Sequence, residues 1–312
     1  MQLQLNAQAC CPACGSLNLA LIGTIPSSDL FAGRQLPKPR EGGALYGCRV
    51  CHLSFRYPCA SNDELNSLYE TGCGNAWTSG QPRKDWKIAK AWIEERLPLG
   101  SSILDVGCFD GGFLNTLVPG YERCGIEIQR SAREEACGTG VRLIAAKYDE
   151  LVNWSDRFDA VVAFDLVEHV RDPANLLAMF AGAVRPSGLV IVSSGNSDAW
   201  SWRLLGSRYW YCAIGEHISF VNPRWARPIC SRVGLALQSC EIFSHSNSGA
   251  RRKLTEILQN LAYWLAPGPT ALIRRMGVGG KDARRFPELA NYPPSWMSAR
   301  DHFIFLSSKP TI

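Results

Sequence analysis

The chain has 312 residues, of which 46% are hydrophobic and 20% are charged, and its formal net charge is +5. A chain of this length can form one full α/β domain and a smaller unit. No stretch approaches the roughly 18–20 apolar residues that a membrane span needs, and the first residues lack the basic and apolar regions of a secretory signal. These features exclude an integral helical membrane protein and predict a cytoplasmic location, while the mild positive charge permits an anionic partner without requiring one.

Thirteen cysteines are many for such a chain, and without an export signal we expect reduced thiols rather than disulfides. Later ones, such as Cys124 and Cys230, lie in apolar patterns and are interpreted as small buried hydrophobic residues. Two Cys-x-x-Cys pairs near the N-terminus differ, because four thiolates from two such pairs can surround one zinc ion at Zn–S distances of about 2.3 Å. The predicted zinc ligands are Cys11, Cys14, Cys48 and Cys51.

A site with four thiolates leaves no position for water, so we predict a structural zinc ion rather than a catalytic one. Unpaired core cysteines are the alternative interpretation. Cys10 or His52 can also replace one of the four ligands, although either replacement breaks the two-residue spacing. The turn-forming residues around these cysteines predict a small zinc-ribbon-like unit over residues 1–60.

Residues 61–83 are predicted to connect this unit to a main domain over residues 84–312. A short helix is expected around Asp63–Tyr69, with Ser61 or Asn62 as its N-cap.

Strands and helices alternate through the main domain. Strands are predicted at 102–106, 122–128, 141–145, 158–164 and 188–194. Helices are predicted at 84–96, 111–118, 130–137, 173–184 and 223–233. This alternation predicts an α/β fold with a parallel sheet covered on both faces. Two further strands are expected at 236–244 and 302–308.

Between these last two strands lies a predicted helical insertion over residues 249–299. Five apolar residues fall on one face of its first helix, and they are Leu254, Ile257, Leu258, Leu261 and Leu265. Pro267-Gly-Pro269 ends that helix, and Ala271–Arg275 begins another.

Three cations lie at the N-terminal end of that first helix, where the helix dipole disfavours each by about 0.3–1 kcal/mol. They are Arg251, Arg252 and Lys253. An anionic partner, such as a substrate phosphate or a membrane surface contacted through 249–275, would explain them. A solvated basic face near acidic residues is the alternative interpretation.

A glycine-containing turn follows the first predicted strand of the main domain. That strand contains Asp105, and the turn carries Gly107 and Gly111, which allow positive φ and a close approach to a ligand. Glu127 ends the next strand, where a carboxylate can accept both hydroxyls of a ribose. Strand, turn, second strand and carboxylate together predict a nucleoside-binding βαβ unit.

The same turn excludes two common phosphate-binding motifs. Phe109 occupies the position of the middle glycine in the dinucleotide motif, and the turn lacks the Lys-Ser/Thr ending of a phosphate-cradling loop. A ligand without phosphate needs neither an anion nest nor a lysine. We therefore predict that the turn binds an adenosyl group that carries an amino acid.

These motifs resemble those of the class I S-adenosylmethionine-dependent methyltransferases. LDVGCFDGGF matches the first motif of that family, GIEI the second, FDAVVAFDLVEHVRDP the fourth strand with its loop, and RPSGLVIVSSGN the fifth strand. The similarity spans roughly residues 84–245. Phe109 departs from the commonest first motif, which has glycine there.

This resemblance implies a Rossmann-like sheet of seven strands in which 236–244 and 302–308 form an antiparallel hairpin. It implies S-adenosylmethionine as the methyl donor. The residues implied to bind it are Asp105, Gly107, Cys108, Phe109, Gly111, Glu127, Asp165, Glu168 and His169. Asp165, Glu168 and His169 resemble a segment that has been linked to a divalent cation in ubiquinone-type O-methyltransferases. An orienting role for these three residues is one interpretation, and binding of a catalytic Mg²⁺ is the alternative.

Glu216-His217 belongs to a segment, EHISF, that resembles the acceptor side of sugar and small-molecule methyltransferases. The resemblance implies that this pair is the general base, since histidine accepts a proton near neutral pH. A histidine that bridges loop backbone is the alternative. Zinc-bearing relatives have tyrosine where this chain has Ile214. A tyrosine-assisted mechanism is therefore not expected, unless Tyr209 or Tyr211 takes the place of that tyrosine.

The leading hypothesis is methyl transfer to a small hydroxylated metabolite, in particular a sugar or nucleotide-sugar. A ribosomal RNA methyltransferase is a second hypothesis, although the N-terminal unit lacks the dense Lys and Arg that phosphate binding requires. The third is a protein that binds S-adenosylmethionine without turnover.

Overall fold

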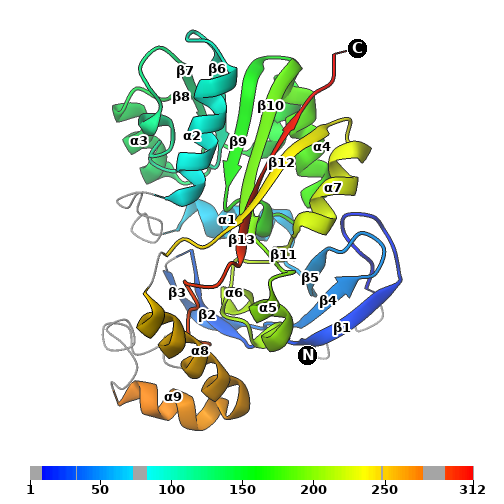
Figure 1. Cartoon of the computed structure of the whole chain (residues 1–312), viewed down its shortest axis with the longest axis vertical. Helices are drawn as coiled ribbons and strands as arrows, with labels where there is room; N and C mark the ends of the chain where they lie inside the picture. The colour runs from blue at the N-terminus through cyan, green and yellow to red at the C-terminus, as the bar shows by residue number, and fades with distance from the viewer. Residues whose placement is uncertain (1–8, 33, 73–82, 247–248, 277–291, 312) are drawn as a thin grey trace.

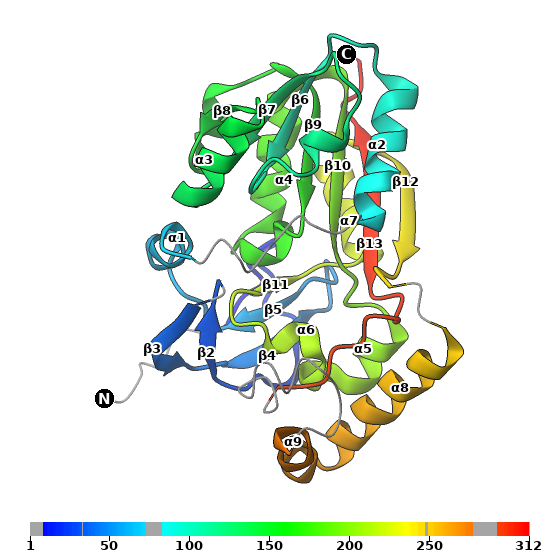
Figure 2. The same cartoon turned by 90° about the vertical axis from the view of Figure 1, so that its left-hand side faces the viewer.

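The computed structural model describes residues 9–32, 34–72, 83–246, 249–276 and 292–311. A large sheet flanked by helices forms one end of the molecule, and a smaller β unit lies beneath the lower edge of that sheet (Figure 1). The C-terminal ends of the parallel strands point toward the smaller β unit (Figures 1 and 2).

The large sheet has seven strands in the order β12-β13-β10-β9-β6-β7-β8. The strands are β6 (Ser102–Val106), β7 (Glu122–Ile126), β8 (Arg142–Ala145), β9 (Phe158–Phe164), β10 (Val184–Gly195), β12 (Ala236–Phe243) and β13 (His302–Ser308). β13 is antiparallel to both β10 and β12, whereas the pairs from β10 to β8 are parallel. The predicted Rossmann-like sheet with an antiparallel final hairpin is therefore confirmed.

Central strands are apolar along their length because helices cover both faces. In β9, Phe158, Val161 and Val162 are all fully buried. The flanking helices are α2 (Lys84–Arg96), α3 (Arg130–Gly138), α4 (Pro173–Ala183) and α7 (Pro223–Arg232). Asn222 is the N-cap of α7, and its side chain accepts a hydrogen bond from the backbone N–H of Trp225.

The helix predicted at 111–118 is wrong, because the structure has only a 3-10 turn at Leu114–Thr116. Two glycines begin this segment, and Pro119 disfavours a helical conformation at the residue before it. The Thr116 hydroxyl also donates to the carbonyl of Phe113 at 2.7 Å, which ends the turn early.

The N-terminal unit is joined to the main domain by a shared sheet. β1 (Leu19–Thr24), β4 (Ala44–Cys48) and β5 (Ser54–Tyr57) are antiparallel, and β5 pairs with β11 (Ser219–Phe220). β11 begins two residues after His217. The N-terminal unit therefore fixes the backbone beside the predicted general base.

Two further elements of the N-terminal half lie below the sheet (Figure 2). The hairpin of β2 (Ser28–Phe31) and β3 (Arg34–Arg40) packs against α1 (Asn62–Glu70), with Phe31 and Leu65 in one buried cluster. Ser61 is the N-cap of α1, since its hydroxyl accepts from the backbone N–H of Glu64.

The described part of the helical insertion contains α8 (Ala250–Leu265) and α9 (Pro267–Arg275), which extend away from the large sheet (Figures 1 and 2). Of the apolar residues predicted on one face of α8, Leu254, Leu258 and Leu265 are 57%, 57% and 74% exposed, whereas Ile257 packs against a buried cluster. Glu256 is buried, and its carboxylate accepts from the backbone N–H of Ser298 at 2.9 Å.

The cations at the start of α8 include Arg252, whose Nε lies 3.1 Å from Glu256. This pair agrees with the interpretation of a basic face near acidic residues, and contact with an anionic surface stays a prediction. Within the described part of the chain, every helix is too short or too polar to cross a bilayer.

Arg56 of β5 is a buried cation that binds backbone carbonyls. Its Nε donates to the carbonyl of His217 at 3.1 Å, and its Nη2 donates to those of Cys212 and Ile214 at 2.9 and 3.1 Å. Burial lowers the pKa of Arg56. The guanidinium thus holds the loop that carries His217 against the N-terminal unit.

Arg56→Met is expected to lower the free energy of unfolding by roughly 3 kcal/mol or more, because three buried carbonyls lose their donor. Arg130→Met is the matched control, since Arg130 is 83% exposed and its pair with Glu134 contributes little. Urea unfolding of both variants measures the difference. Equal stability of the two variants would contradict this role of Arg56.

Candidate active site and metal-ligating clusters

A cavity of about 560 Å³ lies between the strand ends of the large sheet and the N-terminal unit. Its walls come from the glycine turn, the loop after β9, α1, and the segment before β11. The predicted residues that line it are Asp105, Gly107, Cys108, Phe109, Glu127, Asp165, Glu168, His169, Glu216 and His217. The structure therefore brings nearly all predicted site residues outside the cysteine cluster to one cavity.

The backbone N–H groups of the glycine turn are used within the protein. Those of Gly107 and Cys108 donate to the carbonyl of Ile126 at 2.8 and 3.0 Å. The N–H of Phe109 donates to Glu127 Oε2 at 2.9 Å. With these donors engaged, the turn does not form an anion nest, as expected for a ligand without phosphate.

Glu127 is 7% exposed, and each of its oxygens accepts one backbone hydrogen bond. Oε2 binds Phe109 and Oε1 binds the N–H of Gln129 at 2.8 Å. Burial raises the pKa of Glu127, and these two bonds partly offset the effect. Since a carboxylate has about four acceptor positions, two remain for the hydroxyls of a ribose.

Asp105 is the penultimate residue of β6 and is 3% exposed. Its Oδ1 has no hydrogen-bond partner among the described residues. Burial, together with the nearby charge of Glu127, raises the pKa of Asp105 to about 8, although Arg83 opposes the rise. A buried carboxyl without a partner fits a ligand that brings its own donors or positive charge, as an amino acid does.

Gly111 lies outside the described lining of the cavity. Its φ is +79°, and a Cβ there would lie 2.8 Å from a methyl group of Val141. Glycine is therefore required at this position for the packing of the turn against the segment before β8, and its contact with the ligand stays a prediction.

The loop after β9 divides its three predicted residues between two clusters. Asp165 has a φ of +48° and lies close to His245 and His302. Glu168 and His169 lie instead close to His217. The hypothesis that Asp165, Glu168 and His169 form one cation site is therefore not supported by the described geometry.

Asp165 is held by a charged network. Arg83 Nη2 lies 2.6 Å from Asp165 Oδ2 and 2.6 Å from the fully buried Asp85. Burial alone would raise the pKa of Asp165, but the charge of Arg83 outweighs it and keeps that pKa below its usual range.

Glu168 is fully buried and accepts hydrogen bonds on both oxygens. The Tyr211 hydroxyl donates to Oε1, and the Ser194 hydroxyl donates to Oε2 at 2.8 Å. Burial and the charge of Asp165 raise the pKa of Glu168 to about 7. Tyr211 is thus committed to Glu168.

His217 has one fixed nitrogen and one available nitrogen. Its Nδ1 lies 3.0 Å from the backbone carbonyl of Tyr211, which can only accept, so Nδ1 carries the proton. Burial lowers the pKa of His217 well below its usual value, and His169 adds to the effect. Nε2 is therefore unprotonated and can accept a proton within the cavity.

Glu216 is not the orienting partner of His217. Its Oε1 accepts from the backbone N–H of Ala32 at 3.0 Å, which ties the segment before β11 to the β2–β3 hairpin. In the described structure, the polarisation of His217 comes from the Tyr211 carbonyl, while Glu216 anchors the loop.

Several residues of this site carried no local sequence signal. His245 and His302 come from the ends of β12 and β13, and Asp301 lies beside His302. Neither histidine belongs to a recognisable motif, and only the sheet brings them beside Asp165. The spacing of residues along the chain does not encode that contact.

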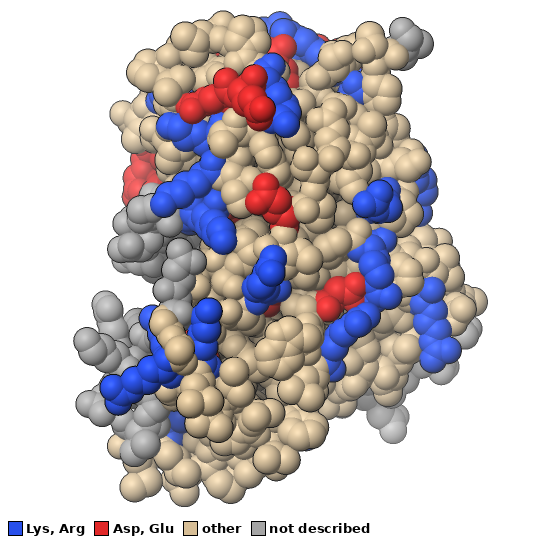
Figure 3. Space-filling view, in the orientation of Figure 1, with Lys and Arg blue, Asp and Glu red and all other residues tan. Residues whose placement is uncertain are grey.

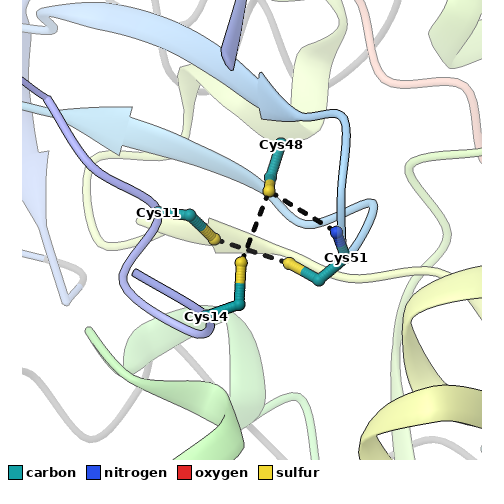
Figure 4. A group of neighbouring side chains, drawn as sticks. All are labelled: Cys11, Cys14, Cys48 and Cys51. Atoms are coloured by element: carbon teal, nitrogen blue, oxygen red, sulfur yellow. Dashed lines mark hydrogen bonds between the residues drawn. The ribbon is translucent and has the colours of Figure 1, made fainter. Parts of the chain in front are cut away.

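The four predicted zinc ligands form a compact cluster (Figure 4). All four sulfur atoms lie within 4.8 Å of one another, with Cys11 to Cys51 at 3.4 Å and Cys14 to Cys48 at 3.6 Å. These separations exceed the disulfide bond length of about 2.05 Å and are close to the roughly 3.8 Å edge of a Zn–S tetrahedron. Cys10 is exposed and outside the cluster.

Comparison with known proteins identifies the main domain. A family model described as a methyltransferase domain matches residues 83–239. The ubiquinone biosynthesis O-methyltransferase of Alkalilimnicola ehrlichii is 33% identical over 179 residues, covering 50% of this chain and 69% of that protein. A protein with the same name from Aromatoleum aromaticum is 31% identical over 160 residues, covering 46% and 68%.

One solved structure is similar over most of the fold. The complex between the Haloferax volcanii Trm112 methyltransferase activator and a methyltransferase matches with a TM-score of 0.52 and 16% identity, covering 81% of this chain and 100% of that one. At this identity the likeness shows a shared fold and nothing about substrate.

Asp105 is expected to make the ligand-free protein less stable as the pH rises. The folded state retains its proton up to about pH 8, whereas the unfolded carboxyl loses it near the ordinary aspartate pKa of 3.8, so the free energy of unfolding falls across this interval. Asp105→Asn removes this decrease in the free energy of unfolding. The variant is expected to be more stable than the parent by more than about 1 kcal/mol at pH 8.5, and to have no such advantage at pH 4.

Urea unfolding at the two pH values measures this effect, with the exposed Asp149→Asn as the control. A stability difference between Asp105→Asn and the parent that is the same at both pH values would show that Asp105 is not a buried, uncompensated carboxyl.

Proposed function

Because this chain belongs to the S-adenosylmethionine-dependent class I methyltransferases, we propose that it transfers a methyl group to a hydroxyl of a small metabolite. The observation that carries this proposal is that Asp105, Glu127 and His217, whose Nδ1 is engaged, all line one cavity. Its volume falls within the range of about 300–1,000 Å³ that is typical of small-molecule sites.

S-adenosylmethionine, when bound, supplies an electrophilic methyl group on a positively charged sulfur. The free acceptor positions of Glu127 suit the ribose hydroxyls, and the unpartnered Asp105 suits the amino-acid part. Both fit the observed site without rearrangement of the glycine turn.

Methyl transfer to a hydroxyl releases one proton, which a nearby base must accept. His217 Nε2 serves this purpose, since Nδ1 is engaged and burial keeps the ring neutral. Arg56 and Glu216 then position the loop rather than take part in proton transfer.

Sugars and nucleotide-sugars are the acceptors that we put first, because the N-terminal cysteine unit resembles the extensions of deoxysugar methyltransferases. The curated relatives are named for ubiquinone biosynthesis, which favours a phenolic hydroxyl as the second acceptor class. Both classes contain a hydroxyl that must lose a proton.

An RNA acceptor has less support. The cavity is walled by α1 and by the segment before β11, which restricts it to small groups. On the face shown in Figure 3, basic and acidic side chains are interspersed and no continuous basic surface is visible. Phosphate-dominated binding requires such a surface.

We further propose that the cysteine cluster binds structural zinc. Cys11, Cys48 and Cys51 are buried within the main hydrophobic cluster, which also contains Trp225 of α7. Zinc would replace mutual repulsion of thiolates by four metal bonds and would fix β4 and β5 beside the cavity.

Cys14→Ser is expected to abolish zinc binding and to lower the melting temperature by more than about 5 °C, because metal binding contributes directly to folding. Zinc content by mass spectrometry and thermal unfolding measure these effects. Cys240→Ser is the control, since Cys240 is exposed and outside the cluster. A parent protein without bound zinc would refute the assignment.

His217→Gln is expected to lower kcat by roughly 100-fold or more while leaving the affinity for S-adenosylhomocysteine unchanged. The assay uses labelled methyl donor with a panel of nucleotide-sugars and phenols. Glu216→Gln should lower kcat less, because that carboxylate binds Ala32. Near-normal kcat in His217→Gln would remove His217 as the base.

A further inference from the structure

We propose that Asp165, His245 and His302 bind one divalent transition-metal ion inside the cavity, and that this ion holds the oxygen of the acceptor. The second clause rests on the proposed function, whereas the metal site itself does not. One ligand atom from each residue lies within 4.8 Å of the other two, and all three residues line the cavity.

The large sheet brings the three ligands together. His302 begins β13 and pairs with Phe243 at the end of β12, so His245 lies just beyond that pair. The rings of His245 and His302 have centroids 4.4 Å apart at an interplanar angle of 73°. Asp165 follows β9 on the other side of β10, where its N–H donates to the Ser193 carbonyl.

His302 is oriented as metal-bound histidines are. Its Nδ1 lies 2.9 Å from Asp301 Oδ1, which leaves Nε2 for a ligand. Asp301 is itself buried and accepts a hydrogen bond from the Tyr209 hydroxyl. A carboxylate behind the second ring nitrogen fixes ring orientation and strengthens the histidine as a ligand.

Asp165 also has one engaged and one available oxygen. Arg83 binds Oδ2, while the buried Oδ1 has no partner among the described residues. The backbone at Asp165 is left-handed, with φ at +48°, which is a feature that clusters at functional sites.

The local charge favours a cation despite the presence of Arg83. That guanidinium is shared between Asp165 and the fully buried Asp85, and Asp301 adds a third carboxylate behind His302. Two of these carboxylates bind the guanidinium and the third binds His302, so three carboxylates accompany one guanidinium. A divalent ion would compensate the excess negative charge.

The ligand types indicate the class of ion. Two imidazoles and one carboxylate suit Mn²⁺, Fe²⁺, Co²⁺ or Zn²⁺ better than Mg²⁺ or Ca²⁺, which prefer oxygen ligands. Three protein ligands leave positions open for an acceptor oxygen. The Tyr211 ring lies between this site and the predicted base, with centroids 5.5 Å from His302 and 4.1 Å from His217.

The neighbouring cluster of Glu168, His169 and His217 is a weaker candidate. Both oxygens of Glu168 accept hydrogen bonds from hydroxyl groups, and Nδ1 of His169 lies 2.8 Å from the Tyr69 hydroxyl. The described structure gives this cluster no carboxylate oxygen that is without a partner.

The test is a Co²⁺ titration of the full-length protein, followed by calorimetry and visible absorption. We expect one Co²⁺ per chain whose spectrum lacks the intense thiolate charge-transfer band, which separates it from the cysteine cluster. His245→Ala and Asp165→Asn should each weaken this binding at least tenfold. His217→Gln, in the neighbouring cluster, should leave it unchanged.

The proposal is overturned if the parent binds Co²⁺ through thiolates alone. It is also overturned if Co²⁺ binding without a thiolate band is undiminished in both His245→Ala and Asp165→Asn. If His217→Gln weakened Co²⁺ binding as much as the other two substitutions do, the ion would lie in the neighbouring cluster, and the proposed site would be wrong. Binding of S-adenosylhomocysteine, measured on the same samples, tests the methyltransferase assignment separately. Retained binding of that ligand without Co²⁺ binding refutes the metal site alone.

Discussion

The carboxylate of Glu127 connects the two strands on which ligand binding depends. It follows the last residue of β7 and accepts the N–H of Phe109 in the turn after β6, so it closes the turn before any ligand arrives. The remaining N–H groups at Gly107 and Cys108 are held by the Ile126 carbonyl. The turn is thereby shaped for a nucleoside and withholds the donors that a phosphate would need. The family assignment and the site geometry agree on this point.

The other half of the cavity depends on the N-terminal unit. β5 pairs with β11, and Arg56 donates to three carbonyls of the loop that carries His217. Glu216 fastens the same loop to the β2–β3 hairpin through Ala32. The N-terminal unit therefore fixes the loop on which the proposed base lies.

Elements with strong periodicity were predicted well, and contacts between distant strands were not. The strands at 102–106, 158–164 and 302–308 match the structure because their apolar runs are bounded by turns. Local patterns failed at 111–118, where glycine and Pro119 limit the helix. His245 and His302 could not be paired with Asp165 from sequence, since three strands bring them together.

Titration calorimetry with S-adenosylhomocysteine tests whether the glycine turn and Glu127 bind the nucleoside of the methyl donor. We expect the parent to bind one molecule per chain, and Glu127→Ala to bind at least tenfold more weakly, because it loses both the ribose acceptor and the bond to Phe109. The exposed Glu134→Ala should bind as the parent does. Absence of binding by the parent, or undiminished binding by Glu127→Ala, would show that the nucleoside does not bind at this turn.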